Sequence, residues 1–433
     1  MAKLAINGGT PIRTKLFPAY NTIGKEEKQA VIKVLKSGNL SQYIGGWHHD
    51  FFGGSTVKKL EEDWSALFGT KHSITVNSNT SGLFTVMGAI GIQPGDEVIV
   101  SPYSMSASAI APLVYGGIPV FADIDEDTLC MSTSSIEKCI TPRTKAILVV
   151  HIMGHPADMD AIMLLAKKHN LRVVEDCAQA PLGKYKNQYV GSIGDVGVFS
   201  LNYHKHIHTG EGGVIVTNDS DLAFRCQMIR NHAENITAPK EVKDLTNLIG
   251  YNYRMTEIEC AIGVEQLKKL PRLLAKRLEN VAFFDEKLED FPALSVQKKQ
   301  PAGNIHCYYQ YPVFFDADIA GVHRNRFVDA LKAEIPSAVL RETAPLIGAG
   351  YVKPLYLAPI YQQKAAWAFT HQANEQAYIN YEKGICPVTE KMHFEKLFSL
   401  EYMRPGLSRK DMQDVINAID KIFNNMNELK SNA

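Results

Sequence analysis

The feature that most constrains the fold is a repeated alternation of short apolar runs and helical stretches between residues 71 and 218. The runs are apolar on both faces, which is typical of strands in a mainly parallel sheet covered by helices on each side. Between two of them, Asp160–His169 has helical spacing. This alternation predicts an α/β domain. The expected strands are Ser73–Val76, Glu97–Val100, Val120–Phe121, Ala146–Val150, Arg172–Val174, Val196–Phe199 and Gly213–Val216.

The pattern changes after about residue 271. We expect a helix over Leu273–Asp290 and another over Lys410–Asn425, with mixed strands between them. Such a mixture predicts a second, smaller α+β domain. The expected parts of the chain are an N-terminal arm over residues 1–20, a large domain over 21–270 and a small C-terminal domain over 271–433.

The charges of the chain balance, with 46 lysines and arginines against 46 aspartates and glutamates. This balance gives no reason to expect nucleic acid or an anionic membrane as a partner, so a small-molecule ligand is the default expectation. Seven cysteines lie scattered without a CxxC pair, which is typical of reduced thiols. The N-terminus lacks a signal-peptide core, and no apolar run approaches the roughly 20 residues of a membrane helix. We therefore expect a cytoplasmic location.

The segment Thr75–Leu83 leads from a predicted strand through a polar turn into a helix. Backbone N–H groups at a helix N-terminus, together with the hydroxyls of Ser78, Thr80 and Ser81, suit a phosphate. Taken alone, the segment is better explained as an ordinary helix cap.

A carboxylate follows a second predicted strand. Asp176 ends the apolar run that begins at Leu171, and Gln179 lies three residues further on. The carboxyl end of a buried parallel strand is where open α/β sheets bind ligands. A pyridinium nitrogen needs an anionic partner of this kind to stay protonated and accept electron density. Taken alone, such a residue is more commonly a helix cap.

The residues from Val196 to Gly213 are the most informative part of the chain. A predicted strand delivers Ser200, and Lys205 follows in a loop just before a glycine-rich turn. Glycines allow tight turns and close approach of backbone to a ligand. A lysine there can form an imine with an aldehyde if its surroundings lower its pKa. A single lysine in a loop is usually only solvated, but here three candidate segments follow one another in order.

Three motifs together resemble the DegT/DnrJ/StrS-type sugar aminotransferases, which are fold type I enzymes that use pyridoxal 5'-phosphate (PLP). The motifs are Glu175-Asp-Cys-Ala-Gln-Ala, Phe199-Ser-x4-Lys205-x4-Gly-Glu-Gly-Gly and Gly250-Tyr-Asn-Tyr-Arg-Met-Thr-Glu, and the resemblance runs from Ala5 to Lys391. It implies the type I PLP aminotransferase fold, with a large, mainly parallel-sheet PLP domain and a smaller C-terminal α+β domain. It also implies a homodimer with shared active sites.

The resemblance implies roles for the residues that match the family motifs. Lys205 would hold PLP as a Schiff base and later move the proton between donor and cofactor. Asp176 would pair with the pyridine nitrogen, and Gln179 would contact the phenolic oxygen of the ring. The phosphate would be held by Ser200 and the Asn79–Thr80 turn.

A further role would cross between subunits. Asn252 would reach the phosphate of the neighbouring subunit, because family members build each active site across a dimer interface. Arg254 lies two residues away and could serve instead.

The chain departs from the family pattern in two places. The helix turn usually reads Ser-Gly-Thr, whereas Asn79 stands here in place of the glycine, and a backbone donor survives that change. The aromatic residue that stacks on the PLP ring aligns with Met105. Because a thioether can pack on an aromatic face, either Met105 packs on the cofactor or Tyr103 has taken over.

The resemblance predicts an aminotransferase that moves an amino group from glutamate or glutamine to a keto-sugar in amino-sugar biosynthesis. Nucleotide-linked keto-hexoses are the favoured acceptors, because they are the commoner substrates of the family. A keto-cyclitol of the scyllo-inosose type is the alternative, since the motifs beginning at Ala5, Gly350 and Cys386 look more like that branch.

Two other functions stay open as alternatives. Some family members carry histidine in place of the cofactor lysine and are keto-sugar dehydratases, but Lys205 has the aminotransferase spacing, five residues after Ser200. A PLP-binding protein without turnover would not require the intact lysine, aspartate and glutamine.

No metal site is predicted. His204, His206 and His208 alternate along the chain, but no carboxylate or cysteine lies at ligand spacing nearby. His151 follows the strand Ala146–Val150 at the expected cofactor edge. It is therefore either a site residue or a core histidine.

Overall fold

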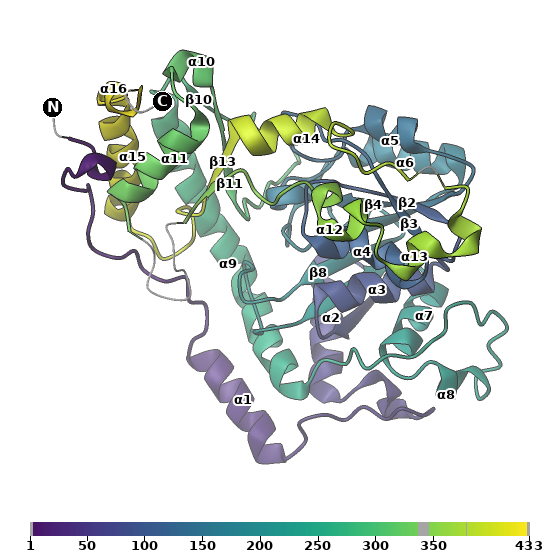
Figure 1. Cartoon of the computed structure of the whole chain (residues 1–433). Coiled ribbons are helices and arrows are strands. Elements are labelled where there is room, and N and C mark those ends of the chain that lie inside the picture. Colours follow the sequence, from purple (N-terminus) through teal and green to yellow (C-terminus); the bar gives the residue numbers. More distant parts are fainter. Residues whose placement is uncertain (1–2, 337–345, 378, 431–433) are drawn as a thin grey trace.

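The computed structural model describes residues 3–336, 346–377 and 379–430. Its main sheet has seven strands in the order β1-β9-β8-β5-β4-β2-β3 (Figure 1). Strands β8, β5, β4, β2 and β3 pair in parallel, and β9 runs antiparallel to both of its neighbours. The seven strands predicted from the sequence are these seven, which confirms the mainly parallel sheet. Their bounds are β1 His72–Val76, β2 Glu97–Val100, β3 Ile118–Phe121, β4 Thr144–Val150, β5 Arg172–Asp176, β8 Val196–Ser200 and β9 Gly213–Thr217.

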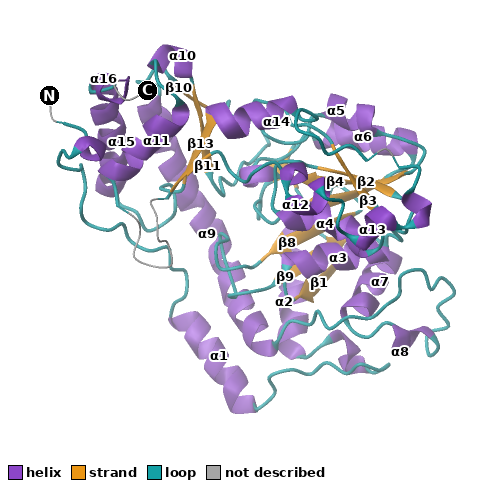
Figure 2. Ribbon diagram, in the orientation of Figure 1, coloured by secondary structure: helices purple, strands orange, loops and turns teal. Residues whose placement is uncertain are grey.

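Helices cover both faces of this sheet (Figure 2). In β9, Ile215 packs in the cluster that holds helix α3, whereas Val214 and Val216 pack in the cluster that holds α2 and α9. This follows from the alternation of side chains along a strand. The apolar runs of the sequence are buried on both faces for this reason. The covering helices are α2 Ser55–Phe68, α3 Asn79–Ala89, α4 Ser106–Val114, α5 Thr133–Cys139, α6 Met159–His169, α7 Ser220–Arg230 and α9 Glu257–Leu288.

A second, antiparallel sheet has the strand order β10-β11-β13-β12. Helix α9, which is 32 residues long, reaches from the main sheet toward this second sheet (Figure 1). The predicted division at residue 270 falls inside α9 and stays a prediction. The elements here are β10 Leu294–Val296, β11 Tyr311–Phe315, α10 Ala317–Ala320, α11 Arg324–Glu334, β12 Ile347–Ala349, β13 Leu397–Leu400, α15 Arg409–Asn424 and α16 Asn427–Lys430.

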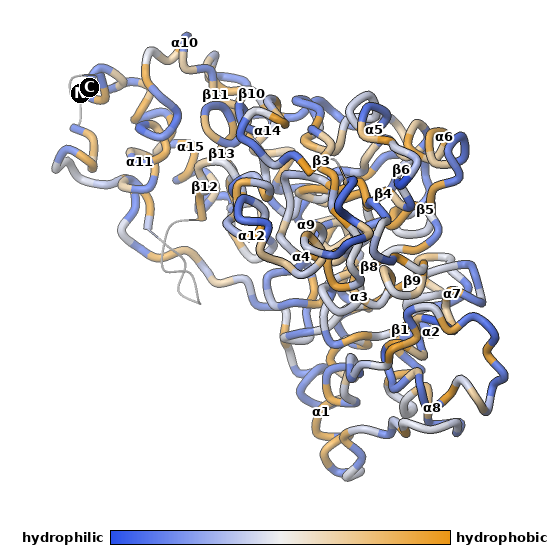
Figure 3. The backbone as a smooth tube through the Cα atoms, turned by 45° about the vertical axis from the view of Figure 1, so that its right-hand side comes forward, coloured by the Kyte–Doolittle hydropathy of each residue, from blue (hydrophilic) through white to orange (hydrophobic). Residues whose placement is uncertain are grey.

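Both ends of the described chain enter the core of the second sheet. Leu4 and Phe17 are fully buried there beside side chains of α9, α11 and α15. The backbone N–H of Leu4 donates to Oε2 of Glu428 at 3.2 Å, and Arg13 pairs with Asp411 at 2.8 Å. Hydrophilic stretches of the backbone trace lie mainly on the outer loops of the molecule (Figure 3). The N-terminal segment is thus part of a core made mostly by the C-terminal part.

The chain after β12 packs back against the main sheet. Tyr356, Tyr361 and Tyr381 surround Phe121 at the end of β3. Asp123 accepts hydrogen bonds from the N–H groups of the first turn of α14. This returning segment carries η4 Leu355–Leu357, α12 Pro359–Gln362, α13 Trp367–Thr370, η5 Gln372–Asn374, α14 Pro387–Lys391 and the π-helix η6 Met392–Lys396.

The remaining elements are short, apart from one helix that extends from the body of the molecule (Figure 1). That helix is α1, and it packs along α9. None of the helices in the described residues is long and apolar enough to cross a membrane. The bounds are η1 Ala5–Asn7, α1 Lys25–Ser37, η2 His49–Phe52, η3 Ile152–Gly154, β6 Lys184–Tyr185, β7 Gln188–Tyr189 and α8 Glu234–Thr237.

Candidate active site

A cavity of about 530 Å³ lies at the carboxyl ends of strands β4, β5 and β8. Parallel strands end at one edge of a sheet, which is where open α/β sheets bind ligands. The cavity brings together all but one of the site residues predicted from the sequence. They are Asn79, Thr80, Met105, Asp176, Gln179, Ser200 and Lys205.

Lys205 is buried beside this cavity, with 8% of its surface exposed. Its ammonium lies 4.4 Å from the ring centre of Tyr309. Burial lowers the pKa of Lys205 to about 8, although the nearby Asp176 carboxylate opposes that change. A lysine in this state is partly neutral near physiological pH, and only the neutral amine attacks an aldehyde.

The loop around Lys205 is held from behind. The hydroxyl of Tyr20 donates to the carbonyl of His206 at 2.5 Å, and His206 Nε2 lies 2.9 Å from the carbonyl oxygen of Cys307. Because a carbonyl only accepts, His206 Nε2 carries a proton. A side chain of the N-terminal arm and a backbone carbonyl from beyond α9 thus fix the position of the lysine loop.

Asp176 is the buried carboxylate of the site, with 4% of its surface exposed. It accepts hydrogen bonds from Ser108 Oγ at 2.8 Å, the Ala178 N–H at 3.1 Å and Asn79 Nδ2 at 3.4 Å. Burial raises the pKa of Asp176, and these three donors together with Lys205 only partly oppose that rise. Such a buried carboxylate is suited to a cationic ring nitrogen, because a positive charge beside it would stabilise its ionised form.

The N-terminus of α3 forms one wall of the cavity. Ser78 caps this helix, with its Oγ accepting the N–H of Ser81 at 3.0 Å. First-turn N–H groups of a helix have no acceptor within the helix, so those of Asn79 and Thr80 are suited to an anion. A Cβ at Gly213 would lie 2.7 Å from the carbonyl carbon of Ser78, so β9 can approach this turn only with glycine there.

Gln179 is held at both ends of its amide and is 3% exposed. Its Oε1 accepts the backbone N–H of Met153 at 2.6 Å. Its Nε2 donates to the hydroxyl of Tyr351 at 2.8 Å. Tyr351 comes from the chain just after β12 and lines the cavity as well.

The structure separates the roles of Met105 and Tyr103. Met105 lines the cavity at the start of α4 and is 53% exposed. Tyr103 is fully buried outside the lining, and its hydroxyl accepts the backbone N–H of Tyr351 at 2.8 Å. Of the two side chains, Met105 is therefore the one that a ligand in the cavity can touch.

Several residues of the site were missed by the sequence reasoning. Ser108 lies one helical turn into α4, and nothing in its local sequence shows that it faces Asp176. Glu211 belongs to the glycine-rich motif that was recognised, so it could have been found. Tyr309 and Glu401 also line the cavity but come from the second half of the chain, without a recognised motif. Tyr351 lines it as well and belongs to the motif that begins at Gly350, but that motif was used only to compare acceptors and gave it no role in the site.

His151 is a core residue, as one of the two sequence interpretations had it. It is fully buried and does not line the cavity. Its Nδ1 accepts the N–H of Ala157 at 3.1 Å, so Nε2 carries the proton and donates to Glu175 at 3.0 Å. Glu175 also accepts three backbone N–H bonds, from Gly191, Ile193 and Gly194.

The other histidines do not gather at one point. Within the described residues, the groups whose ligand atoms lie within 4.8 Å of one another are His48–His49–Asp50 and His151–Glu175–Cys177. In the second group, both ring nitrogens of His151 and both carboxylate oxygens of Glu175 are already used in the hydrogen bonds described above. Of the alternating set, His204 lines the cavity and His206 is buried.

Asn252 lies outside the cavity of its own chain and is exposed. It forms a backbone bridge with Asn231, and its Oδ1 accepts from Arg254 Nε at 2.8 Å. The two residues that the sequence offered for the phosphate of a neighbouring subunit are therefore bonded to each other on the surface.

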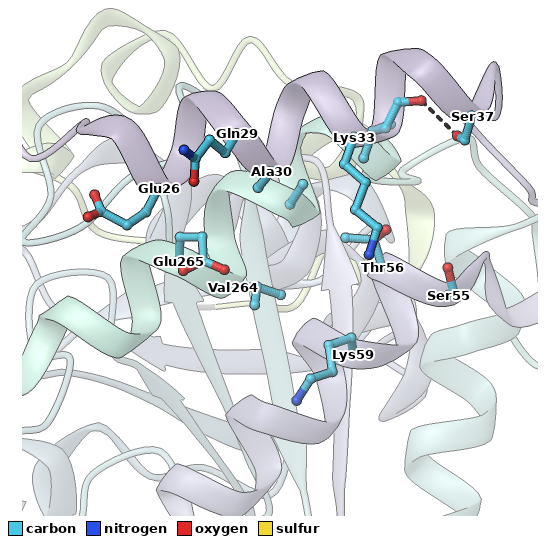
Figure 4. Close-up of a pocket in the computed structure, with 12 residues that line it drawn as sticks. Glu26, Gln29, Ala30, Lys33, Ser37, Ser55, Thr56, Lys59, Val264 and Glu265 are labelled. Atoms are coloured by element: carbon cyan, nitrogen blue, oxygen red, sulfur yellow. Dashed lines mark hydrogen bonds between the residues drawn. The ribbon is translucent and has the colours of Figure 1, made fainter.

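A separate hollow of about 700 Å³ lies between α1, α2 and α9 (Figure 4). Polar side chains that line it, such as Lys33 and Lys59, lie exposed on the surfaces of α1 and α2. Ser37 donates to the Val34 carbonyl of its own helix at 2.7 Å. This hollow shares no lining residue with the cavity at the strand ends.

The cavity at the strand ends matches the three groups that PLP presents. The buried amine of Lys205 suits an aldehyde, the buried carboxylate of Asp176 suits a protonated ring nitrogen, and the N-terminus of α3 suits a phosphate. The fold and this set of residues define a PLP-dependent enzyme of the aminotransferase class. Residues 21–420 match the DegT/DnrJ/EryC1/StrS aminotransferase family, and the chain belongs to this family, whose cofactor is PLP.

Individual relatives support the assignment. The chain is 34% identical to the spore coat polysaccharide biosynthesis protein SpsC of Bacillus subtilis, over 92% of this chain and 95% of that protein. It is 31% identical to the L-glutamine:2-deoxy-scyllo-inosose aminotransferase of Streptoalloteichus tenebrarius, over 99% of both chains. It is similar to the crystal structure of DesI in the presence of its TDP-sugar product, with a TM-score of 0.81, 25% identity and coverage of 99% and 98%.

Proposed function

We propose that this aminotransferase moves an amino group from glutamine or glutamate to an uncharged keto-cyclitol. The observation that carries the proposal is the charge of the cavity lining. Among the described residues that line it, Lys205 is the one lysine or arginine, while Glu211 and Glu401 add two carboxylates beside Asp176. The carboxylate of Glu401 is paired with Arg404, which does not line the cavity, so Glu211 is the carboxylate that adds most to the acidic character of the lining. Carboxylates accept hydrogen bonds from hydroxyl groups and repel a diphosphate. The lining therefore suits a neutral polyol better than a nucleotide.

The relatives support the same acceptor and suggest the donor. The aminotransferase of Streptoalloteichus tenebrarius, named for L-glutamine and 2-deoxy-scyllo-inosose, matches this chain over 99% of both lengths. The sequence alone favoured nucleotide-linked keto-hexoses. The acidic lining moves our preference to the cyclitol.

A nucleotide-linked keto-hexose stays the second candidate, in the context of amino-sugar biosynthesis. It is favoured by the similarity of the whole chain to the crystal structure of DesI in the presence of its TDP-sugar product. A keto-sugar dehydratase is less favoured, because lysine stands at position 205 where such family members have histidine.

In the proposed mechanism, Lys205 holds the cofactor through its amine and later moves a proton at the reacting carbon of the amino donor. Asp176, which lines the cavity, would keep the ring nitrogen protonated, and Gln179 would donate to the phenolic oxygen. PLP, when bound, supplies the electron sink for this proton transfer. The phosphate is held by Ser200 and by the α3 turn at Asn79 and Thr80.

Two further contacts complete the proposed cofactor site. Met105 packs its thioether on the ring, since it is the candidate that lines the cavity. Asn252 acts on the phosphate of a second copy of the chain. Its exposed position outside its own cavity supports a homodimer with shared sites. The cytoplasmic location stays a prediction.

The test of function is the absorption spectrum of the purified protein before and after addition of glutamine or glutamate. We expect the band of lysine-bound PLP to bleach with the donor, and to be absent from Lys205→Ala but present in Lys298→Ala, a surface lysine paired with Asp127. The protein that has reacted with the amino donor is then mixed, in separate samples, with a keto-cyclitol or with a nucleotide-linked keto-hexose. Return of the band with the keto-hexose alone would refute the cyclitol proposal.

The test of the shared site is subunit complementation. We expect Lys205→Ala and Asn252→Ala proteins each to have little activity, because each homodimer lacks one residue in both sites. Mixed after reversible dissociation, they should recover about a quarter of wild-type activity, since half of the dimers then carry one intact site. A mixture no more active than its parts would show that Asn252 serves its own subunit or no cofactor at all.

A further inference from the structure

The orientation of the Gln179 amide is fixed by a backbone donor. Met153 offers an N–H at 2.6 Å, and only the oxygen end of the amide can accept it. The nitrogen end is therefore the end that faces Tyr351. This assignment depends on the hydrogen-bond network and not on distinguishing nitrogen from oxygen in the side chain.

The backbone at Met153 has an unusual conformation that serves this contact. Its φ is 55° and its ψ is 9°, a left-handed conformation that a residue with a side chain adopts only at a cost. Its carbonyl accepts the N–H of Tyr309 at 2.7 Å and lies 3.1 Å from His306 Nε2. Both polar groups of Met153 are thus committed, and the oxygen end of Gln179 has a rigid partner.

The nitrogen end of Gln179 has one acceptor among the described residues, the hydroxyl of Tyr351. An amide nitrogen carries two hydrogens, so the second remains free on a side chain that lines the cavity. Burial raises the pKa of Tyr351 well above its usual range, so its hydroxyl stays neutral. The neutral hydroxyl accepts a hydrogen bond from the amide N–H and adds no negative charge to the site.

Tyr351 itself is held from the opposite side. Its N–H donates to the buried hydroxyl of Tyr103, and the two rings meet edge to face with centres 6.0 Å apart. Gly350 packs so tightly against the π-helix that a Cβ there would lie 2.6 Å from His393 Nδ1. Its φ of 74° also favours glycine. The segment that presents Tyr351 is therefore anchored to η6 and to the loop after β2 of the main sheet.

We propose that Tyr351 is a positioning residue that holds the Gln179 amide so that its second Nε2 hydrogen points at the phenolic oxygen of the bound cofactor. The proposal rests on the role given to Gln179 in the proposed function. It also assigns Tyr103 to anchoring Tyr351 instead of stacking on the cofactor. A residue of the C-terminal part would in this way tune a cofactor bound on the main sheet.

The experiment is a double-mutant cycle of Tyr351→Phe and Gln179→Ala, followed by PLP titration of the apo protein. We expect each single variant to bind PLP about three- to tenfold more weakly, the loss typical of one hydrogen bond. The double variant should bind no more weakly than Gln179→Ala, because Tyr351 acts through the glutamine. Losses that multiply in the double variant would overturn the proposal.

A spectroscopic measurement separates positioning from a general structural role. A donor to the phenolic oxygen stabilises its anionic form, so its loss raises the pH midpoint of the lysine-bound PLP band. We expect the same upward shift in Tyr351→Phe, Gln179→Ala and the double variant. The control is Tyr361→Phe, which removes a buried hydroxyl that has no hydrogen-bond partner among the described residues and should leave the midpoint unchanged. An unshifted midpoint in Tyr351→Phe would reject the proposal.

The measurements use no amino donor and no ketone, so they are independent of turnover. If the wild type shows the band but transfers no amino group, the proposed function fails and the cycle still decides the role of Tyr351. If the wild type shows no lysine-bound band, the roles of Lys205 and Gln179 fail, and the proposal for Tyr351 fails with them.

Discussion

Strand β5 ends in two neighbouring carboxylates, Glu175 and Asp176, which lie in two different regions of the molecule. Successive side chains of a strand point to opposite faces. Glu175 is fully buried, and its two oxygens are filled by three backbone N–H groups and the His151 ring. Asp176 lies at the wall of the cavity, where its donors are two side chains and one N–H.

The comparison shows how a structural carboxylate differs from one available to a ligand. The partners of Glu175 are mostly backbone groups of residues 191–194, so its charge ties that loop to the sheet. Asp176 has fewer donors and an open side, and burial raises its pKa. We therefore expect loss of Glu175 to affect folding and loss of Asp176 to affect chemistry.

The largest expected effect is on stability. Glu175→Ala leaves three backbone N–H groups and the His151 ring without an acceptor in the core, which should lower the free energy of unfolding by about 3–5 kcal/mol. Urea unfolding followed by circular dichroism would measure it. Glu137→Ala, which removes an exposed partner of Lys168, should cost less than about 1 kcal/mol. Similar losses in the two variants would break the comparison.

Asp176→Asn should show the opposite pattern. The neutral amide keeps the size of the side chain, and a raised pKa means that the site tolerates a neutral group, so stability should change little. Without the anionic partner of the ring nitrogen, the rate of the reaction with the amino donor should fall about 100-fold, which is about 2.7 kcal/mol. Stopped-flow bleaching of the PLP band measures this rate. A variant that unfolds as readily as Glu175→Ala would erase the difference between the two residues.

The pH dependence of cofactor capture gives the third test. Only the neutral amine of Lys205 attacks the aldehyde, and its pKa is lowered to about 8. The rate at which the apo protein forms the PLP band should therefore rise about tenfold between pH 7 and pH 9 and then level off. A rate that keeps rising to pH 10 would show a lysine with an ordinary pKa.

Ser108→Ala should have the smallest effect of the four. It removes the 2.8 Å donor to Asp176 Oδ2 and leaves the other two donors in place. Because the lost bond favours the ionised form, the pKa of Asp176 should rise further. The rate with the amino donor should fall about three- to tenfold, and more so at lower pH. Ser134→Ala, on the surface of α5, is the control. No change with Ser108→Ala would mean that the carboxylate does not depend on this donor.

Much of the fold could be predicted because buried parallel strands leave a clear apolar signal. All seven strands of the main sheet were found, and β5 runs two residues beyond the predicted end at Val174, so that Asp176 is its last residue. The start of α9 was missed by sixteen residues, since Pro271 reads as a break in a helix that runs on from Glu257. A Thr256–Glu259 capping box marks the true start, and packing on α1 and α2 supports the helix around the proline.

The cofactor residues could be predicted because the family motifs mark them and because most of them lie at or just after the carboxyl ends of strands that the sequence shows clearly. Tyr351 and Glu401 could not, because their place beside Gln179 and Lys205 depends on how the second sheet folds back on the first. The partners of Asp176 and Glu175 were hidden because most of them, such as Ser108 and Gly191, come from other segments of the main-sheet part and meet the carboxylates only in the folded protein. Neighbouring carboxylates look alike in a sequence, and only the donors that meet them in space distinguish them.

The burial of Leu4 and Phe17 beside the C-terminal helices has a consequence for synthesis on the ribosome. The main sheet is complete once the chain has reached β9, and it can begin to pack while later residues are still being made. The second core joins residues more than 400 positions apart, such as Leu4 and Glu428. The first residues to emerge must therefore wait, unprotected, until nearly the whole chain has been translated. Chaperones that bind exposed apolar segments should meet this protein at its N-terminal arm.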